Sequence, residues 1–416
     1  TLSIHSFPTR RSSDLSSNTV YIGGKFKAAN STNAAALNSS HGLTDLPFLG
    51  FNGPVTSITK SSAGKIIFGG SFTGLGNASV ISDPDQQIIN IAKAKITSGP
   101  APTNADFADP KNIVCKESGA DGPGNTWLLA DNSPGFWRAD FGFGFQPTKL
   151  RLWNTHQDGR GTKTWRYTAM PINGIMNFTY VDPATGANSS CSSECPLSND
   201  PNVPFQDFFF VNVIGMNTFQ IDISDWFGSG GGLTGVKLFE NDIYSYAIND
   251  FNEPDCAVSS STASKATVAG PWEVTPSRQS VSNYLTLKID GSKASSDSES
   301  IVFFPHIKES GNYSVNIYTP GCIQDDSCAT RGQVRVTGTM DAASSEPAFQ
   351  TDVFQTNNFD KYDQIYIGFV DAGSDAFRPS IKLAPSSGQS GQVTAVANRV
   401  GFTLLDSAGG LNSLFE

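Results

Sequence analysis

Charged residues, histidine and long hydrophobic runs are scarce in this chain. Only 16% of its 416 residues are charged, and four are histidine. The net charge of −10 argues against nucleic-acid binding, because a phosphate-binding surface needs a basic excess. No apolar run reaches the ~18 residues of a transmembrane helix. With so little histidine, and without Gly-x-Ser-x-Gly, Walker or His-Glu-x-x-His motifs, the sequence predicts no enzyme, no metal site and no cofactor.

Residues 1–15 carry no information about the fold. His5–Leu15 reads HSFPTRRSSDL, which is the translation of a common sequencing-adapter oligonucleotide. We interpret residues 1–15 as an artefact of that origin and exclude them from the fold prediction. They therefore say nothing about a secretion signal, and the compartment has to be inferred from other features.

The cysteines indicate disulfides. Two pairs lie close together in sequence among loop residues, and the remaining two cysteines bracket a candidate domain. The total of 6 cysteines allows about fifteen pairings. The spacing favours Cys191–Cys195, Cys322–Cys328 and Cys115–Cys256. Zinc is the alternative, but it needs finger-like spacing with histidines, and neither short pair is a Cys-x-x-Cys. Disulfides indicate an oxidising, extracellular compartment.

N-glycosylation motifs agree with that compartment. Asn-x-Ser/Thr without an intervening proline begins at Asn30, Asn38, Asn77, Asn177, Asn188 and Asn312. The motif is short and chance matches are common. The sequons therefore support an extracellular location only in combination with the cysteine pattern.

An internal repeat opens the rest of the chain. Val20–Phe26 (VYIGGKF) matches Ile66–Phe72 (IIFGGSF), at a spacing typical of the ~40–50-residue blade of a β-propeller. Paired glycines suit strands that approach the crowded propeller axis, although two unrelated hairpins are the alternative. A closed propeller needs about four blades. We therefore predict that residues 16–80 form a partial, kelch-like β-propeller.

The remaining residues predict two further β domains. Prolines and scattered polar residues indicate a linker over 81–112, and a Ser/Thr/Ala-rich stretch indicates another over 257–270. Short aromatic and β-branched runs predict a first β-sandwich over 113–256 and a second over 271–405. The composition, with 29 Phe, 40 Gly and 23 Pro, supports an all-β protein whose sandwiches are galactose-binding-like jelly rolls.

One polar loop is a candidate ligand site. Asn154–Trp165 lies between two predicted strands. Trp153 or Trp165 could stack on a sugar while Asp158, Arg160 and Lys163 hydrogen-bond to it. The alternative is structural, because such loops in galactose-binding-like sandwiches often pack their arginine and tryptophan into the fold. The acidic pair Asp325-Asp326 could offer oxygen ligands to calcium, but it matches no EF-hand loop, and solvated loop charges are the alternative.

Several strings together resemble the fungal cortical polarity landmark proteins, also called bipolar bud-site selection proteins. They are Gly124–Leu129 (GNTWLL), Trp137–Phe141 (WRADF), Leu150–Thr155 (LRLWNT), Gly159–Lys163 (GRGTK), Cys191–Leu197 (CSSECPL) and Tyr318–Cys322 (YTPGC). The resemblance implies a large single-span membrane glycoprotein with a propeller ectodomain, into which two sandwiches are inserted after early blades. It also implies that 406–416 begin the resumed propeller, and that the membrane segment lies beyond the last residue. It supplies no catalytic residues.

The function implied by the resemblance is non-enzymatic. We expect a cell-surface landmark glycoprotein ectodomain on the outer side of the plasma membrane, marking sites of polarised growth or budding. Its expected partners are other surface landmark proteins or wall glycan. The alternative is a secreted or wall-associated carbohydrate-binding protein. A copper radical oxidase on a kelch propeller is a third possibility, but it needs tyrosine, cysteine and histidine ligands in the propeller, and residues 16–80 contain no cysteine.

Overall fold

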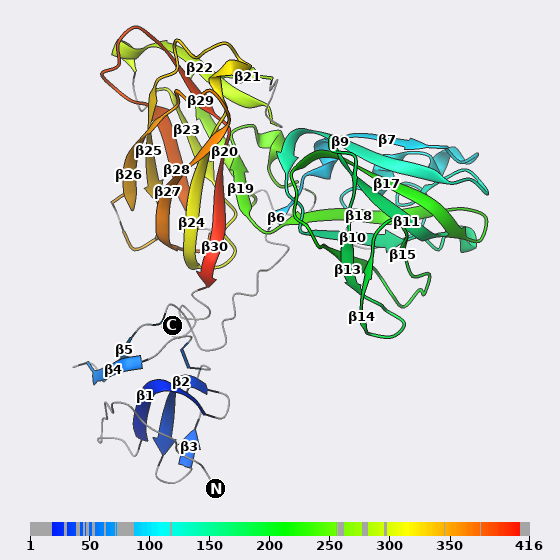
Figure 1. Ribbon diagram of the computed structural model, residues 1–416, viewed down its shortest axis with the longest axis horizontal. Helices are drawn as coiled ribbons and strands as arrows, with labels where there is room; N and C mark the ends of the chain where they lie inside the picture. The colour runs from blue at the N-terminus through cyan, green and yellow to red at the C-terminus, as the bar shows by residue number, and fades with distance from the viewer. Residues whose placement is uncertain are drawn as a thin grey trace.

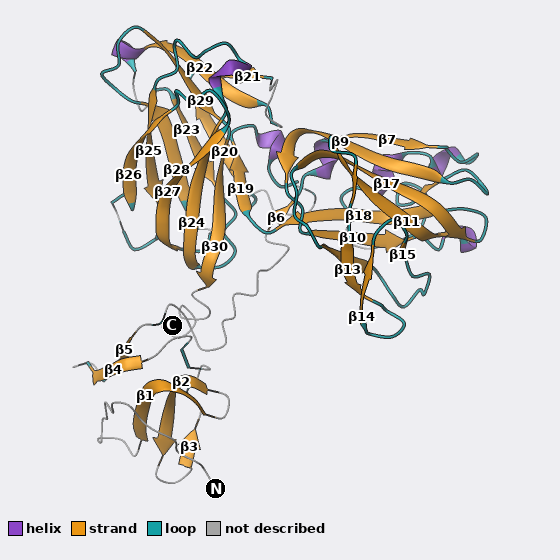
Figure 2. Cartoon of the chain, viewed as in Figure 1, coloured by secondary structure: helices purple, strands orange, loops and turns teal. Residues whose placement is uncertain are grey.

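The computed structural model describes residues 19–28, 31–38, 42–44, 46, 50–51, 55–61, 64–70, 72, 87–116, 119–254, 256, 262–276, 282–294, 298–344, 346–374 and 376–407. Residues 1–15, the sequons at Asn30 and Asn77, and most of the predicted resumed propeller over 406–416 lie outside this set. Strands dominate (Figure 2), which confirms the all-β prediction. No helix in the described part of the chain is long and apolar enough to cross a membrane.

The N-terminal part forms two small antiparallel sheets. The first has the order β1-β2-β3, and the second is the hairpin β4-β5. Their bounds are β1 (Thr19–Ala28), β2 (Ser31–Asn38), β3 (Gly42–Thr44), β4 (Val55–Lys60) and β5 (Ile66–Gly70). The repeated glycines fall in β1 and β5, and a Cβ added to Gly23 would collide with Val55. The described residues form no closed propeller, so the propeller stays a prediction.

The first sandwich has two antiparallel sheets (Figure 1). One runs β14-β13-β16-β10-β18-β6, with β8 also paired to β18, and the other runs β12-β11-β17-β9-β7, with β15 also paired to β11. The first comprises β6 (Gln87–Ile88), β8 (Trp127–Leu128), β10 (Lys149–Asn154), β13 (Phe178–Val181), β14 (Asn188–Cys191), β16 (Gln206–Phe210) and β18 (Gly232–Glu240). The second comprises β7 (Lys95–Gly99), β9 (Gly135–Phe145), β11 (Gly161–Met170), β12 (Gly174–Ile175), β15 (Cys195–Pro196) and β17 (Met216–Phe227).

Aromatic side chains fill the space between these two sheets. Successive side chains of a strand point to opposite faces, so Trp165 and Tyr167 of β11 both point inward and are fully buried. The ring of Tyr167 stacks on Phe219 of the neighbouring β17, with 4.9 Å between centroids. Each buried side chain of this size contributes about 1.5–3 kcal/mol. The alternating aromatic pattern therefore specifies which face of each sheet becomes the core.

The second sandwich is built from three sheets, with the orders β19-β30-β24-β27, β20-β23-β28-β25-β26 and β21-β22-β29. The first comprises β19 (Ile243–Tyr246), β24 (Gly311–Thr319), β27 (Lys361–Val370) and β30 (Arg399–Ser407). The second comprises β20 (Lys265–Ala269), β23 (Ser300–Phe304), β25 (Gln333–Thr339), β26 (Phe349–Phe354) and β28 (Ser380–Pro385). The third comprises β21 (Glu273–Thr275), β22 (Tyr284–Asp290) and β29 (Gln392–Ala397).

Short 3-10 helices complete the described elements. Before Cys256 they are η1 (Ile91–Lys93), η2 (Ala105–Phe107), η3 (Pro110–Ile113), η4 (Gln157–Gly159) and η5 (Asn249–Phe251). After Cys256 they are η6 (Gly291–Lys293) and η7 (Cys322–Gln324). Each is a single turn in a connection, so no α-helical layer covers either sandwich among the described residues.

The predicted linker over 81–112 is wrong for the residues that the structure describes. β6 pairs with β18 and β7 pairs with β9, so both are strands of the first sandwich. Ile91, Phe107 and Ile113 from the same stretch are buried. The sequence did not predict these strands, because the apolar residues of this stretch are separated by polar residues and prolines and form no apolar run of strand length.

Two other predicted boundaries also differ. β20 lies in the predicted linker over 257–270 but pairs with β23 of the second sandwich. β19 lies in the stretch assigned to the first sandwich, over 113–256, but pairs with β30 of the second. The chain therefore passes into the second sandwich before Cys256. The boundary could not be predicted from local sequence, because the partner of β19 is β30, a strand near the end of the chain.

Arg399 joins the two sandwiches. Its Nη1 donates to the carbonyl of Gly144 in β9 at 3.0 Å and to the hydroxyl of Tyr246 at 3.2 Å. Its Cζ lies 4.7 Å from the ring centroid of Tyr244 and 4.5 Å from that of Tyr318. Cation–π contacts of a desolvated arginine are worth about 2 kcal/mol. A single side chain of β30 thus contacts both sandwiches.

A buried carboxyl group interacts electrostatically with Arg399. Glu240 ends β18, and its Oε2 is buried without a hydrogen-bond partner among the described residues. Burial is the main reason that the pKa of Glu240 is raised from 4.5 to about 8. The positive charge of Arg399 opposes this rise in pKa, whereas Asp242 and Glu253 add to it. The carboxyl group is therefore protonated in the folded protein at neutral pH.

This burial predicts a pH-dependent stability. The unfolded chain loses the proton of Glu240 near pH 4.5 and the folded chain keeps it until about pH 8, so the free energy of unfolding falls as the pH rises through that interval. Glu240→Gln mimics the protonated side chain. As the pH rises through the interval, we expect the free energy of unfolding of the variant to increase relative to that of the wild type by at most about 1.4 kcal/mol per pH unit. Urea unfolding at several pH values measures this, and a pH-independent difference would contradict it.

Candidate functional site

The structure forms the three disulfides that the spacing favours. The Cα atoms are 5.6 Å apart in Cys115–Cys256, 5.1 Å in Cys191–Cys195 and 4.8 Å in Cys322–Cys328. Among the residues that the structure describes, no group of His, Cys, Asp and Glu could hold a metal ion. The cysteines thus act as crosslinks in this fold.

The sequon asparagines within the described residues lie on strands or directly beside them. Asn177 directly precedes β13 and is exposed, and Asn188 begins β14 and is also exposed. Asn312 is the second residue of β24 and is half-buried. Asn38 ends β2.

The predicted ligand loop is held by its own hydrogen bonds. Asn154 donates from Nδ2 to the carbonyls of Thr162 and Ser198, at 2.8 Å each. Its Oδ1 accepts from the backbone of Thr155 at 3.0 Å and of Thr162 at 2.8 Å. Asp121 accepts from the backbone of His156 at 3.0 Å. All four hydrogen-bonding positions of the Asn154 amide are used to fix the shape of the loop.

Two of the four candidate ligand residues are packed into the fold. Trp153 is buried beside Phe205, with 5.7 Å between ring centroids. Arg160 is buried as well, forms an ion pair with Asp131, and donates to the carbonyl of Leu129 at 2.6 Å. This arrangement matches the structural alternative considered for the loop, because neither side chain presents its surface to a ligand.

The other two candidates lie at the surface. Asp158 adopts a φ of 54° next to Gly159 in the turn η4. Lys163 forms an ion pair with Asp225 at 2.7 Å, with both side chains about half exposed. The structure therefore does not bring Trp153, Asp158, Arg160 and Lys163 together around one accessible site.

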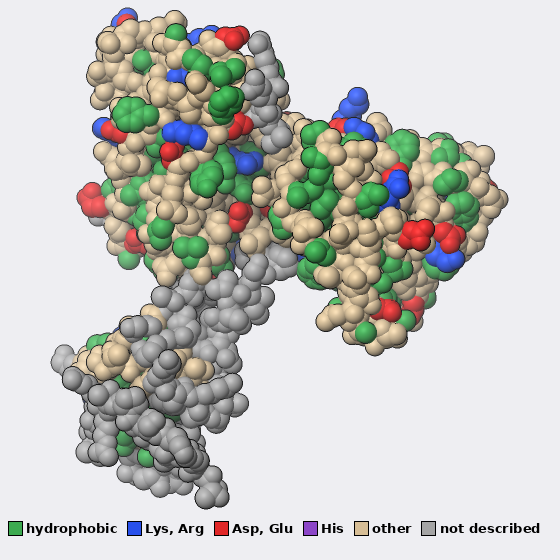
Figure 3. Space-filling model, in the orientation of Figure 1, with side chains coloured by type: hydrophobic (Ala, Val, Ile, Leu, Met, Phe, Trp, Pro, Cys, Tyr) green, Lys and Arg blue, Asp and Glu red, His purple; other side chains and the backbone are tan. Residues whose placement is uncertain are grey.

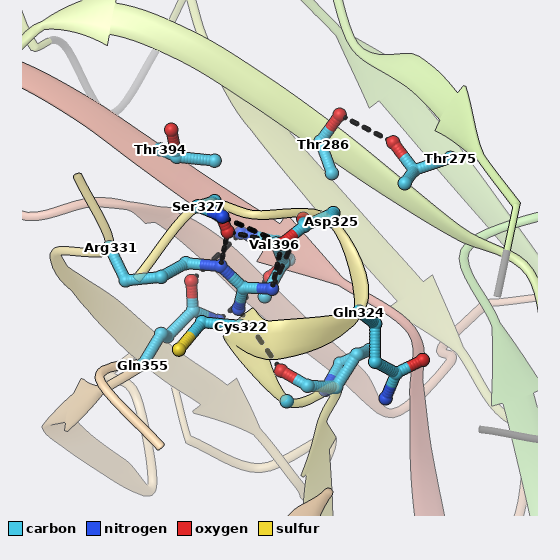
Figure 4. A network of polar contacts seen from close by, with 12 residues as sticks. Thr275, Thr286, Cys322, Gln324, Asp325, Ser327, Arg331, Gln355, Thr394 and Val396 are labelled. Carbon is cyan, nitrogen blue, oxygen red and sulfur yellow. Dashed lines mark hydrogen bonds and ion pairs between the residues drawn. The ribbon is translucent and has the colours of Figure 1, made fainter. Parts of the chain in front are cut away.

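The disulfide Cys322–Cys328 closes a short loop, and a second polar network fixes the conformation of this loop (Figure 4). Arg331 donates from Nε to the Ser327 hydroxyl at 2.6 Å and from Nη1 to the Pro320 carbonyl at 3.1 Å. Its Nη2 lies 3.3 Å from Asp325, and the two side chains are 0% and 9% exposed. Asp325, offered above as a possible calcium ligand, is thus the buried partner of an arginine.

The same loop supports the start of β27. The Cys322 backbone donates to the Asn357 carbonyl at 2.9 Å. The Asp360 carboxylate accepts from the Gly321 backbone at 2.8 Å and from the Gln324 amide. Position 321 needs glycine, because an added Cβ would collide with the backbone that follows Asn357. Hydrogen bonds therefore join the disulfide loop to the residues before β27.

A small pocket opens beside the disulfide loop and the start of β27. Its volume is about 180 Å³. Tyr318 and Tyr362 form an aromatic wall, with 5.9 Å between ring centroids, and Tyr362 is 66% exposed. The lining is Ser282, Tyr318, Thr319, Pro320, Asp360, Lys361, Tyr362, Asn398 and Arg399.

The chemistry of this pocket is mixed. Two tyrosine rings offer apolar faces, while an amide, two hydroxyl side chains and three charged side chains offer hydrogen bonds. Burial raises the pKa of Tyr318, so its hydroxyl stays protonated at neutral pH. Sequence analysis did not identify this site, because Tyr318, Tyr362 and Arg399 come from β24, β27 and β30. No local spacing connects residues that meet only through strand pairing.

The buried Arg331–Asp325 pair generates a stability prediction. Arg331→Met leaves the Asp325 carboxylate buried without its partner, and breaking a buried pair in this way costs about 3–5 kcal/mol. Arg335→Met is the matched control, because its pair with Asp352 is 43% and 34% exposed and contributes at most about 1 kcal/mol. Urea unfolding of both variants measures the difference. Equal destabilisation would show that the network does not hold the loop.

Comparison with known families gives two matches along the chain. The Rax2 second domain matches residues 83–233, and the Rax2 third domain matches residues 244–405. The two matches meet near β19, where the structure passes from one sandwich to the other.

Curated relatives carry related names. Polarized growth protein L1 of Phoma sp. is 51% identical over 408 residues, which covers 97% of this chain and 30% of the relative. The bud site selection protein RAX2 of Saccharomyces cerevisiae is 28% identical over 420 residues, covering 89% of this chain and 33% of the relative. The chain spans about a third of the length of these relatives. Their names refer to growth and budding, not to an enzymatic activity.

Solved structures show only remote likeness. An f-lectin from Morone saxatilis is 11% identical, covers 77% of this chain and 99% of its own, and has a TM-score of 0.26. The family 32 carbohydrate-binding module of Streptococcus pneumoniae EndoD is 10% identical, covers 36% and 99%, and has a TM-score of 0.25. The two matched domains and the named relatives show that this chain belongs to the Rax2 family of fungal polarity proteins.

Proposed function

We propose that this chain is part of the ectodomain of a cell-surface landmark glycoprotein that marks sites of polarised growth or budding. Membership of the Rax2 family carries the proposal, because relatives are named for polarized growth and bud site selection. The three disulfides support an oxidising, extracellular environment. In the longer protein, a membrane segment outside this chain anchors the ectodomain on the outer face of the plasma membrane.

The proposal includes an architecture for the longer protein. The β strands before residue 73 belong to a kelch-like propeller, and the two sandwiches are galactose-binding-like domains inserted into it. In this position the sandwiches face outward, toward the wall or toward another landmark protein. Among the described residues, no group of three or more His, Cys, Asp or Glu side chains could hold a metal ion, so we assign the sandwiches a binding role that needs no metal.

Deletion of the parent gene tests this role. We expect growth or bud sites to lose their normal positions in the deletion strain, and a reintroduced wild-type allele to restore them. A tagged full-length protein should remain with the plasma membrane fraction. Normal site selection in the deletion strain, with the tagged protein released into the medium, would contradict the landmark role and favour a secreted protein.

A second candidate function is carbohydrate binding at the pocket beside Tyr362. The specific observation in its favour is the aromatic wall of Tyr318 and Tyr362 next to Arg399 and Asn398. Sugars present apolar C–H faces and hydroxyl edges, and an aromatic ring with adjacent amide and guanidinium groups recognises both. We propose that the pocket takes a single sugar ring, either a chain end or one residue of wall glycan.

Oligosaccharide titration tests this second function. The probes are tri- and tetrasaccharides of glucose, mannose, galactose and N-acetylglucosamine, titrated calorimetrically into the full chain. We expect one series to bind and Tyr362→Ala to weaken it about tenfold, from the loss of one aromatic stacking contact. Phe354→Ala is the control, because Phe354 is equally exposed and lies outside the pocket. Equal weakening by both variants, or no binding at all, would refute the site.

A further inference from the structure

Three apolar side chains lie exposed at one end of the β19-β30-β24-β27 sheet. Ile367 and Phe369 of β27 are 60% and 39% exposed, and Leu405 of β30 is 45% exposed. These three residues are called the Phe369 patch below. β27 is an edge strand of this sheet, and an edge strand with exposed apolar side chains tends to pair with other chains. Hydrophobic side chains also appear at several places on the face of this sandwich in Figure 3.

Asn312 lies within the Phe369 patch. It is paired directly with Phe369 across β24 and β27, and a bulge between β24 and β30 places Leu405 next to this position. Tyr313 is fully buried, so the alternation of β24 turns Asn312 to the outer face. Ile367 is paired with Ser314 on the same face. Directly paired residues have Cβ atoms about 4.5–5.5 Å apart, so the amide of Asn312 projects beside the Phe369 ring.

Asn312 also begins an Asn-x-Ser sequon, Asn312-Tyr313-Ser314. A glycan linked to its Nδ2 starts with a pyranose whose C–H face can pack on an aromatic ring while its hydroxyls stay in water. We propose that the first sugar of an N-linked glycan on Asn312 packs on the Phe369 patch and covers it. The inference rests on the extracellular location proposed above.

The other sequons of the sandwiches have similar surroundings. Asn188 of β14 is paired directly with Val181 of β13, which is 52% exposed. The carbonyl of Asn177 accepts from the backbone of Val211 at 3.0 Å, and Val211 is 54% exposed. A protein partner could cover any one of these apolar side chains. A protein partner would not explain why a sequon lies beside each exposed apolar side chain. Glycans attached to the three asparagines would explain this arrangement at all three positions.

The first measurement is the occupancy of Asn312. The full chain is secreted from a yeast host, and glycopeptide mass spectrometry reports whether Asn312 carries a glycan. Because the host secretes the chain whatever its native location, an unmodified Asn312 overturns the inference and leaves the extracellular location standing. An occupied Asn312 leads to the second measurement, which tests the contact with the patch alone.

The second measurement compares melting temperatures. The forms are the intact glycoprotein, the glycoprotein trimmed by an endoglycosidase to a single N-acetylglucosamine, and Asn312→Gln. We expect the trimmed form to match the intact one, and Asn312→Gln to melt about 2–4 °C lower, because only the first sugar reaches the patch. Hydrogen exchange of β27 should rise in Asn312→Gln and not in the trimmed form.

A double-mutant cycle identifies the contact. Phe369→Ala should remove most of the effect of Asn312→Gln, whereas Phe354→Ala, 62% exposed and paired with Gln333 instead of a sequon, should leave that effect unchanged. Ile367→Ala gives a second test of the patch. If Asn312→Gln lowers the melting temperature equally in the Phe369→Ala and Phe354→Ala backgrounds, the packing inference is overturned while the extracellular location stands.

Discussion

Arg399 carries its charge into the contact between the two sandwiches, enclosed by the rings of Tyr244 and Tyr318 and by the Gly144 carbonyl. A guanidinium in such a place is stable only if aromatic faces and oxygen acceptors replace its water shell. This requirement fixes β30 and β19 against β9. It also positions the pocket, because Arg399 and Tyr318 line it as well. The pocket's shape therefore depends on the two sandwiches staying in contact.

Much of the fold follows from local patterns. The alternating aromatic residues of β9 and β11, the disulfide pairs and the resemblance strings identify two β domains and their family. The errors arise where long-range pairing decides the structure. β7 is a five-residue strand without an apolar run, and it belongs to the first sandwich only because β9 offers a free edge. β19 likewise takes its place from β30, far away in sequence.

The candidate sites show the same limit. Arg160 and Trp153 were singled out because arginine and tryptophan near a loop suit sugar recognition, but both are buried. Residue type indicates what a side chain can do, whereas burial decides whether a ligand reaches it. The pocket beside Tyr362 was invisible in the sequence, since its tyrosines and arginine come from three strands. The sequon at Asn312 was visible, but its apolar surroundings appear only once β24 and β27 are paired.

The Cys115–Cys256 disulfide has a mechanical consequence. Its cysteines are separated by 141 positions, and β8 to β19 lie between them. A tension applied along the chain would cross from Cys115 to Cys256 through this covalent bond. The backbone between the two cysteines would then not be pulled directly, and force could reach its strands only through noncovalent contacts, such as the hydrogen bonds that β9, β18 and β19 make with β7, β6 and β30. The disulfide would thus protect the greater part of the first sandwich, from β8 to β18, whereas β6 and β7 lie outside the covalent loop.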